Sequence, residues 1–277
     1  MVSQTKVAYS AADRRARLLE VIDELGFARV ADLSETFGVS DVTIRSDLDL
    51  LDQQHAIQRV HGGAVVRNRD LEREPSFEQA LEESAAEKQL IGTLAAGLVR
   101  PGQSILLDVG TTALAVAQAL VARTELSDVV IITNGLSIAL ALEPGIPRFT
   151  VIVTGGTLRP LQHSLVEPLA SSMLRGLHAD LAFIGCNGVD AEHGVTNVNL
   201  PEAQLKQLML SSATAAIIIA DGSKLGQLHL GHVGAIDEFD ALITGPAAGA
   251  RDAQTTALAE SGLRIITTAS EAAAFAG

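Results

Sequence analysis

Glycines and cations follow a series of short apolar segments in the later two thirds of this 277-residue chain. The glycine-containing stretches that end these segments are residues 108–112, 133–135, 155–156, 185–188 and 221–222. Glycine lets backbone N–H groups approach a ligand closely, and the start of a following helix supplies partial positive charge. Thr111 and Thr112 add hydroxyl groups, and Arg159, Lys206 and Lys224 are candidate cations. Together they predict a site for a phosphate-bearing molecule, although each stretch alone is also typical of an ordinary strand-to-helix turn.

Other reactive side chains carry weaker signals. His229 and His232 have a spacing that could ligate a metal, but no cysteine or carboxylate cluster is near them in sequence, so surface histidines are the simpler interpretation. Cys186 is the only cysteine, which excludes an intrachain disulfide and fits a reducing compartment. A lone cysteine at the end of a strand is usually packed and inert. We therefore predict no metal and no cofactor.

The apolar segments predict the elements that position these residues. Strands are expected within 104–110, 129–135, 149–156, 181–188, 215–222, 241–244 and 264–268, with helices at 85–99, 111–120 and 201–212 between them. Continuous β-branched runs indicate strands covered on both faces, hence a mostly parallel sheet between helices. Ligands of such sheets bind beyond the carboxyl ends of the strands, where the glycine stretches lie.

The first 67 residues have a different pattern. Helical spacing is found at 11–25, 31–37 and 40–51, and Gly62-Gly63 separates two short strands at 57–61 and 64–67. In the third helix Ile44, Leu48 and Leu51 form one apolar stripe, which leaves the opposite face free to enter a DNA groove. Three helices and a two-stranded wing predict a winged helix-turn-helix. Its candidate DNA contacts are Ser40, Asp41, Thr43, Arg45, Ser46, Arg59 and His61, of which His61 has the alternative role of packing within the wing.

Charge is divided unevenly along the chain. Residues 1–69 hold nine Lys or Arg and ten Asp or Glu, a net charge of −1, so residues 70–277 carry −12 of the total of −13. Phosphate contact depends on local cations and not on this sum. Because the amino-terminal part is not strongly basic, we expect modest DNA affinity per copy and self-association to a dimer or more, on half-sites about 10 bp or a multiple apart.

Several motifs resemble those of DeoR-type bacterial repressors of sugar metabolism. They are VSDVTIRSDLDLL at 39–51, RVHGGA at 59–64, DVGTT at 108–112, TNG at 133–135, GGTLR at 155–159, EAQLK at 202–206 and ADGSK at 220–224. The resemblance implies a sensor domain similar in fold to ribose-phosphate isomerases and CoA transferases, which responds to a phosphorylated sugar. It places Asp108, Gly110, Thr111 and Thr112 in a first ligand loop, and completes the pocket with Asn134, Gly155, Gly156, Arg159, Glu202, Lys206, Asp221 and Lys224.

Three positions depart from the pattern of that family. Ser46 follows Arg45 where two arginines are usual, Glu167 precedes Pro168 where glycine is usual, and Gly245 stands where an aspartate usually follows threonine. The first removes one cation from the recognition helix. The second adds a carboxylate that could narrow the pocket, and the third removes one near the site.

The sequence thus predicts a cytoplasmic DNA-binding regulator, a repressor of a carbohydrate-utilisation operon whose operator affinity depends on a phosphorylated sugar. We expect a winged helix-turn-helix at 11–67, a linker at 68–84 and an α/β sensor domain at 85–270. No apolar run is long enough to cross a membrane. Two alternatives remain: an isomerase-like enzyme using Asp108, Glu202, Lys206 and Asp221 as acid and base groups, or a second domain that only oligomerises.

Overall fold

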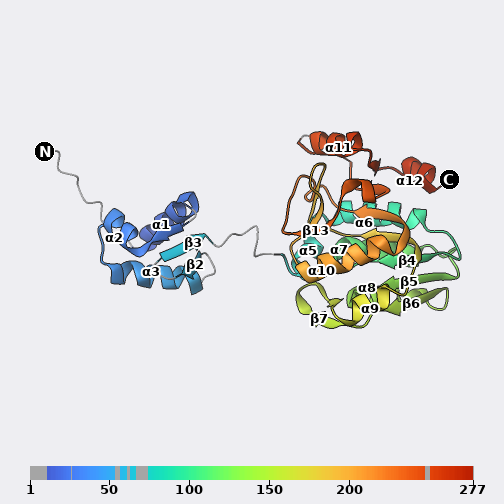
Figure 1. The fold of residues 1–277 in the computed structure, drawn as a ribbon, viewed down its shortest axis with the longest axis horizontal. Helices are drawn as coiled ribbons and strands as arrows, with labels where there is room; N and C mark the ends of the chain where they lie inside the picture. The colour runs from blue at the N-terminus through green and yellow to red at the C-terminus, as the bar shows by residue number, and fades with distance from the viewer. Residues whose placement is uncertain are drawn as a thin grey trace. The chain divides into compact units, whose positions relative to one another are not determined.

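The computed structural model describes residues 11–25, 27–53, 57–60, 63–66, 74–246 and 250–276. Backbone contacts divide the chain into two compact units, Met1–Glu74 and Pro75–Gly277 (Figure 1). Among the helices described, none is long and apolar enough to span a bilayer.

The first unit is a helix-turn-helix with a small sheet. Its elements in order are α1 (Ala11–Leu25), β1 (Phe27–Arg29), α2 (Val30–Phe37), α3 (Asp41–Gln53), β2 (Ile57–Val60) and β3 (Gly63–Val66). Helix α2 ends at Gly38, whose φ of 64° is left-handed, as its glycine predicted. The predicted stripe of Ile44, Leu48 and Leu51 is buried against Leu18 and Ile22 of α1. A core shared by three helices therefore fixes which face of α3 is turned outward.

The small sheet of this unit has three strands, one more than the predicted hairpin. Strand β3 lies in the middle, with β2 on one side and β1 on the other, both antiparallel to it. The predicted hairpin of β2 and β3 is confirmed, and the three-residue strand β1 adds a third strand that was not predicted. A segment so short shows no alternation of apolar and polar residues.

The second unit is built on a seven-stranded parallel sheet. Its strands are β4 (Ser104–Leu107), β5 (Val129–Thr133), β6 (Phe149–Val153), β9 (Ala179–Ile184), β12 (Ala213–Ile219), β14 (Ala241–Ile243) and β15 (Arg264–Ile266). Their order across the sheet is β15-β14-β12-β9-β4-β5-β6, with every neighbouring pair parallel. The chain runs outward from β4 in one direction and then from β9 in the other. The gap between the ends of β4 and β9 is thus the switch point at which such sheets bind ligands.

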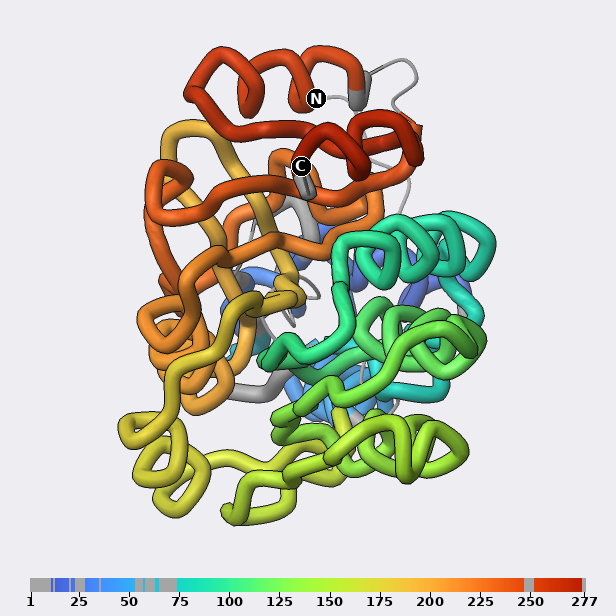
Figure 2. Tube along the Cα trace, turned by 90° about the vertical axis from the view of Figure 1, so that its right-hand side faces the viewer, coloured from blue at the N-terminus to red at the C-terminus, as the bar shows by residue number. Residues whose placement is uncertain are grey.

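Helices cover both faces of this sheet, as the apolar strands predicted. One face packs on α6 (Ala85–Leu98), α7 (Thr111–Ala122), α8 (Leu136–Leu142) and α12 (Ala269–Ala276). The other packs on α9 (Leu169–Leu174), α10 (Leu200–Ser211) and α11 (Ala250–Glu260). Figure 2 shows the teal-to-green helices of the first group gathered on one side of this unit and the yellow and orange segments on the other.

Several smaller features were not predicted. Strands β7 (Thr157–Arg159) and β8 (Ser164–Val166) form a hairpin joined by a 3₁₀ turn, Pro160–Gln162. Strands β10 (Gly188–Asp190), β11 (Gly194–Asn197) and β13 (Gly231–Gly234) form a second small sheet. Two further 3₁₀ turns span Glu143–Gly145 and Ile236–Glu238.

Helix α5 (Phe77–Glu82) was not predicted either, and it lies in the predicted linker of 68–84. Ser76 and Gln79 cap it reciprocally, and Phe77 is buried in the second unit. The structure therefore begins that unit at Pro75, ten residues before the predicted start of the sensor domain.

Candidate functional site

The amino-terminal turn of α3 is organised by short side chains. The Ser40 hydroxyl accepts a hydrogen bond from the Thr43 N–H at 3.2 Å, which caps the helix as predicted. The Asp41 carboxylate accepts one from the Ser34 hydroxyl of α2 at 2.7 Å, so the turn between the helices is tied together. Arg45 and Ser46 are exposed and Thr43 is half-buried, on the face opposite the buried stripe. This is the geometry that a recognition helix needs for base contacts.

An ion-pair cluster that was not predicted from the sequence links α3 to α1. Asp47, only 5% exposed, accepts a hydrogen bond from Arg14 Nε at 2.6 Å and lies 3.4 Å from Arg15 Nη1. Both arginines belong to α1 and are more than thirty residues away in sequence. Of the predicted wing contacts, Arg59 lies on β2 and His61 lies outside the described residues.

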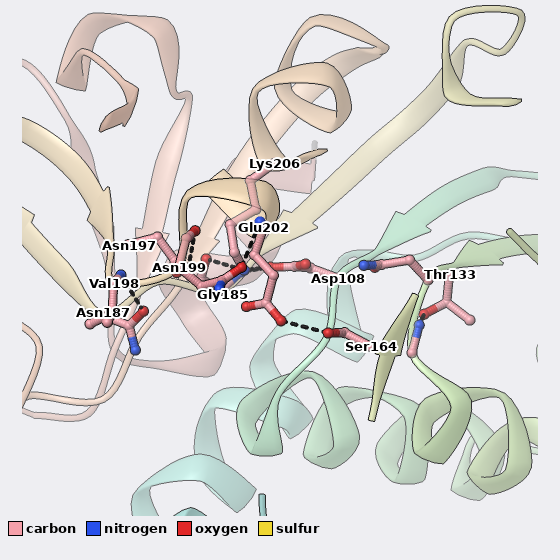
Figure 3. Close-up of polar contacts among 12 residues, drawn as sticks. Asp108, Thr133, Ser164, Gly185, Asn187, Asn197, Val198, Asn199, Glu202 and Lys206 are labelled. Atoms are coloured by element: carbon pink, nitrogen blue, oxygen red, sulfur yellow. Dashed lines mark hydrogen bonds and ion pairs between the residues drawn. The ribbon is translucent and has the colours of Figure 1, made fainter. Parts of the chain in front are cut away.

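In the second unit, Asp108 and Lys206 meet at the switch point of the sheet. Asp108 follows β4, and its Oδ2 accepts hydrogen bonds from Lys206 Nζ and from the Gly185 N–H, the latter at 2.9 Å. Lys206 Nζ also donates to the Gly185 carbonyl at 3.1 Å. Asp108 and Lys206 are 1% and 3% exposed. The structure thus joins β4, β9 and α10 through one buried ion pair (Figure 3).

Burial and neighbouring charges act against each other in this pair. Burial alone lowers the pKa of Lys206, but the Asp108 and Glu202 carboxylates outweigh it, so the pKa of the ammonium lies above its ordinary value. Burial raises the pKa of the Asp108 carboxyl, which the Lys206 ammonium only partly offsets. Lys206 therefore carries the proton at neutral pH and holds Asp108 in place.

Glu202 lies beside this pair and is held from the hairpin. Its Oε1 accepts hydrogen bonds from Arg159 Nη1 of β7 at 2.9 Å and from the Ser164 hydroxyl of β8 at 2.5 Å. Asn199 caps the start of α10 by accepting from the Glu202 N–H at 3.1 Å, which fixes the helix turn that carries the carboxylate. Figure 3 shows the Glu202 and Ser164 side chains pointing toward one another next to Asp108. Glu202 and Lys206 are thus not the exposed surface pair that their spacing also allowed.

Asp221, at the end of β12, faces a lysine that the sequence prediction missed. Lys88 of α6 is 5% exposed, lies 4.0 Å from Asp221 Oδ2 and donates to the Ala80 carbonyl of α5 at 2.6 Å. Burial lowers its pKa more than Asp221 raises it. A buried ammonium with a distant carboxylate is well suited to an anion. Lys224 belongs to the turn after Asp221, whose carbonyl accepts from the Lys224 N–H at 3.0 Å.

The predicted first ligand loop forms the start of α7. Gly110 has a φ of 101°, and no side chain caps the helix at this end. Thr111 is buried and donates weakly to the Ala80 carbonyl at 3.4 Å, whereas Thr112 is half-buried. No side chain of the described residues therefore satisfies the first N–H groups of α7, which is compatible with the predicted anion site but does not test it.

Asn134 and the two glycines after β6 also have structural roles. Asn134 donates through Nδ2 to the Leu165 carbonyl at 3.2 Å, while its buried Oδ1 has no hydrogen-bond partner among the described residues. Gly156 has a φ of 144°, and a Cβ there would lie 2.2 Å from the Val166 carbonyl. That glycine is thus required for the close approach of the hairpin strands. A Cβ on Gly155 would lie 3.3 Å from Leu169.

Two of the departures from the expected pattern have a structural explanation. The Glu167 carboxylate accepts a hydrogen bond from Ser171 and is therefore held toward α9. At Gly245 a Cβ would lie 2.5 Å from Glu87 Oε1. Glu87 reaches from α6 to accept the N–H groups of Gly222 at 2.7 Å and Gly245 at 3.2 Å. A carboxylate is thus supplied here from a different element.

The remaining candidates are His229, His232 and Cys186. Within the described part of the chain, no three His, Cys, Asp or Glu side chains converge to hold a metal ion. His229 donates its N–H to Thr196 at 3.1 Å, and burial raises the pKa of Cys186 to about 12.

Comparison with known proteins identifies the class to which this arrangement belongs. Residues 14–70 match the DeoR-like helix-turn-helix domain, and residues 83–246 match the DeoR C-terminal sensor domain. The chain is 32% identical to the HTH-type transcriptional regulator GolR of Listeria innocua, over 84% of this chain and 89% of that protein. It is 28% identical to the glycerol-3-phosphate regulon repressor of Escherichia coli K12, over 83% and 89%.

The chain is therefore a DNA-binding transcriptional regulator and belongs to the DeoR family. This confirms the resemblance seen in the motifs, and the relatives are named as regulators and not as enzymes. Among solved structures, ribose 5-phosphate isomerase A from Methanocaldococcus jannaschii is similar to 50% of this chain and 52% of that one, at 20% identity. Its TM-score of 0.36 is too low to support an argument about function.

Proposed function

We propose that the protein represses a carbohydrate-utilisation operon and that a phosphorylated sugar, bound at the carboxyl ends of the sheet, changes its affinity for the operator. The observation that carries the effector half is the set of buried cations at one edge of an acidic domain. Lys88 and Lys206 are each at most 5% exposed, and the uncapped start of α7 lies at the same edge. Burying a charge is costly unless it is paired; Lys206 is already paired with Asp108, whereas Lys88 lies 4.0 Å from Asp221 Oδ2 and therefore favours an anionic ligand at this edge.

The polyol part of the ligand has its own partners. Asn134 Oδ1 is a buried acceptor without a described partner, and Glu202 and Asp221 offer further carboxylate oxygens at the same edge. Sugar hydroxyls are donors for these acceptors, while a phosphate is an acceptor for the lysines and for the N–H groups of α7. A phosphate ester of a sugar or polyol matches both sets, which fits the name of the Escherichia coli relative.

The effector half is tested by a thermal-shift screen of sugar and polyol phosphates, followed by calorimetry. A ligand at 100 times its Kd should stabilise the folded protein by about 2.7 kcal/mol. Lys224→Met should lower the affinity for that ligand. The matched control is Arg175→Met, which removes an exposed cation at the end of α9 and should leave the affinity unchanged. If no phosphate ester raises the melting temperature, or if Lys224→Met and Arg175→Met bind equally well, this site assignment is wrong.

The DNA half assigns the base contacts to Thr43, Arg45 and Ser46, with Ser40 and the helix start on phosphate and Arg59 and His61 on the adjacent backbone. Arg45→Ala should cost about 1–3 kcal/mol of operator binding if the guanidinium contacts guanine, and should relax specificity at one position. A uniform loss with a shallower salt dependence would assign it to phosphate. Fluorescence anisotropy over salt and operator variants measures both, and unchanged binding would exclude Arg45 from the interface.

The proposal also includes a cytoplasmic location and self-association to a dimer or a larger oligomer. One winged helix covers one half-site, so a dimer or larger oligomer is needed for two half-sites about 10 bp or a multiple apart. Light scattering should therefore give a mass that is a multiple of 28.9 kDa. A monomer at micromolar concentration that binds one half-site would contradict this part.

A further inference from the structure

The β7–β8 hairpin contacts two different parts of the second unit with its two ends. At the stem, Arg159 and Ser164 both donate to Glu202. At the tip, Gln162 and His163 contact the segment at which the chain enters the second unit after Glu74. The hairpin is therefore a direct physical connection between the proposed effector site and that entry segment.

The contacts at the tip are specific and of several kinds. Gln162 is 7% exposed and its Nε2 donates to the Pro75 carbonyl at 2.7 Å. The His163 ring stacks on Phe77 with centroids 4.9 Å apart, and its Nε2 lies 3.2 Å from Glu78 Oε1. On the other side of the ring, His163 Nδ1 is 2.6 Å from the Ser137 hydroxyl of α8. The imidazole is thus held between α5 and α8.

The far end of α5 also contacts the proposed site. The Ala80 carbonyl accepts hydrogen bonds from Lys88 Nζ at 2.6 Å and from the Thr111 hydroxyl at 3.4 Å. Lys88 faces Asp221, and Thr111 begins α7. Helix α5 has only six residues, too short to be stable without these contacts. Its position therefore depends on groups that a ligand would engage.

We propose that the hairpin and α5 form the coupling element of this regulator: docking of α5 against Gln162 and His163 keeps the protein competent for its operator, and an anion that takes Arg159 away from Glu202 releases it. This inference rests on the proposed function. An effector can shift the operator equilibrium only through a part of the molecule that differs between the two states. The entry segment is where the chain passes from the DNA-binding unit into the sensor. When α5 moves away from the hairpin, the chain that leads to the DNA-binding unit is therefore released as well.

The test measures operator affinity of the full-length protein without any effector. The probe is a DNA fragment that the wild-type protein selects from a genomic library. Gln162→Met removes the donor to Pro75 at similar volume. His163→Asn removes the ring stack and the Glu78 contact, and asparagine tolerates the φ of 52° at this position. Leu161→Ala is the matched control, because Leu161 lies in the same turn and is 38% exposed.

Both coupling variants should bind the operator at least about fivefold more weakly than wild type, at the lower end of usual allosteric couplings, while Leu161→Ala should match wild type. Hydrogen exchange should show faster exchange of the α5 amides in the two variants only. Arg159→Met, which removes one of the two donors from the stem to Glu202, should weaken operator binding in the same way. Combining it with His163→Asn should give less than the product of the two effects, because both act through one element.

Three results would overturn the inference. Unchanged operator affinity in variants whose α5 amides exchange faster would show that docking of α5 is not coupled to DNA binding. Unchanged exchange of α5 would show that the hairpin tip does not hold it. An equal loss in Leu161→Ala would show an unspecific effect. If the wild-type protein selects no fragment at all, the proposed function fails instead, which distinguishes the two failures.

Discussion

The buried Asp108–Lys206 pair allows a sharp test, by replacing Lys206 with methionine. Methionine keeps most of the side-chain volume but leaves Asp108 with the Gly185 N–H as its remaining donor among those described above. Removing one partner of a buried ion pair costs about 3–5 kcal/mol, because the other charge stays buried without compensation. For a unit of this size that is about 6–20 °C in melting temperature. Lys206→Met is thus a stability variant and cannot report on ligand binding alone.

The pH dependence of the stability loss in Lys206→Met shows whether the unpaired Asp108 carboxylate causes that loss. Burial already raises the pKa of Asp108 in the wild-type protein, and removing the Lys206 ammonium raises it further. A group whose folded pKa lies above the unfolded value of about 3.9 contributes stability below that value and loses it as pH rises through the folded pKa. The deficit of Lys206→Met should therefore be small near pH 4 and grow toward neutral pH.

Calorimetry of the full-length chain can follow this, since the larger unit has the larger unfolding enthalpy. Gln204→Met, an exposed position on the same helix, is the matched control and should change stability by less than about 0.5 kcal/mol at every pH. A loss below about 1 kcal/mol at neutral pH, or a loss that does not vary with pH, would refute the proposed role of the pair.

Three further predictions concern other parts of the chain. Gly245→Asp should destabilise the second unit by about 1–3 kcal/mol, since its Cβ displaces the Glu87 carboxylate from two N–H groups; adding Glu87→Ala should recover part of this in a double-mutant cycle, and strict additivity would contradict the argument. Cys186, with a pKa of about 12, should react at pH 8 with a thiol reagent on the order of 10³ times more slowly than an exposed cysteine, and urea should abolish the difference; fast labelling of the folded protein would show that the thiol is accessible. Asp47→Asn should lower the stability of the first unit by about 1–3 kcal/mol in urea unfolding, because Arg14 and Arg15 lose a buried carboxylate; an unchanged midpoint would show that the cluster is dispensable.

The main elements could be predicted because each has a strong local signal. The β-branched runs predicted all seven strands of the parallel sheet, and the stripe of Ile44, Leu48 and Leu51 predicted the buried face of α3. Strands β1, β7 and β10 have three residues each, as β14 and β15 do, but they lack the apolar run that predicted those two strands. Helix α5 did have a signal, since Ser76 and Gln79 form a capping box.

The site was only partly predictable, since its main contacts join distant residues. Lys206 and Asp108 are 98 positions apart, and Lys88 comes from a helix with no motif around it. The sequence named Glu202 and Arg159, but not that one oxygen of Glu202 accepts from both Arg159 and Ser164. Which charges satisfy one another depends on the sheet order, and nothing in the local pattern fixes that order.

The way Glu202 is held has a consequence for what can act as a signal. A simple inorganic anion that attracts Arg159 deprives the carboxylate of one donor and offers none in return. Glu202 Oε1 then keeps the Ser164 hydroxyl as a donor but loses the charged one, so part of the compensation for its burial is lost. A molecule that brings hydroxyl groups together with its phosphate replaces the lost donor as it takes the arginine. For the effector site proposed above, this exchange of partners favours a phosphate ester that carries hydroxyl groups over inorganic phosphate.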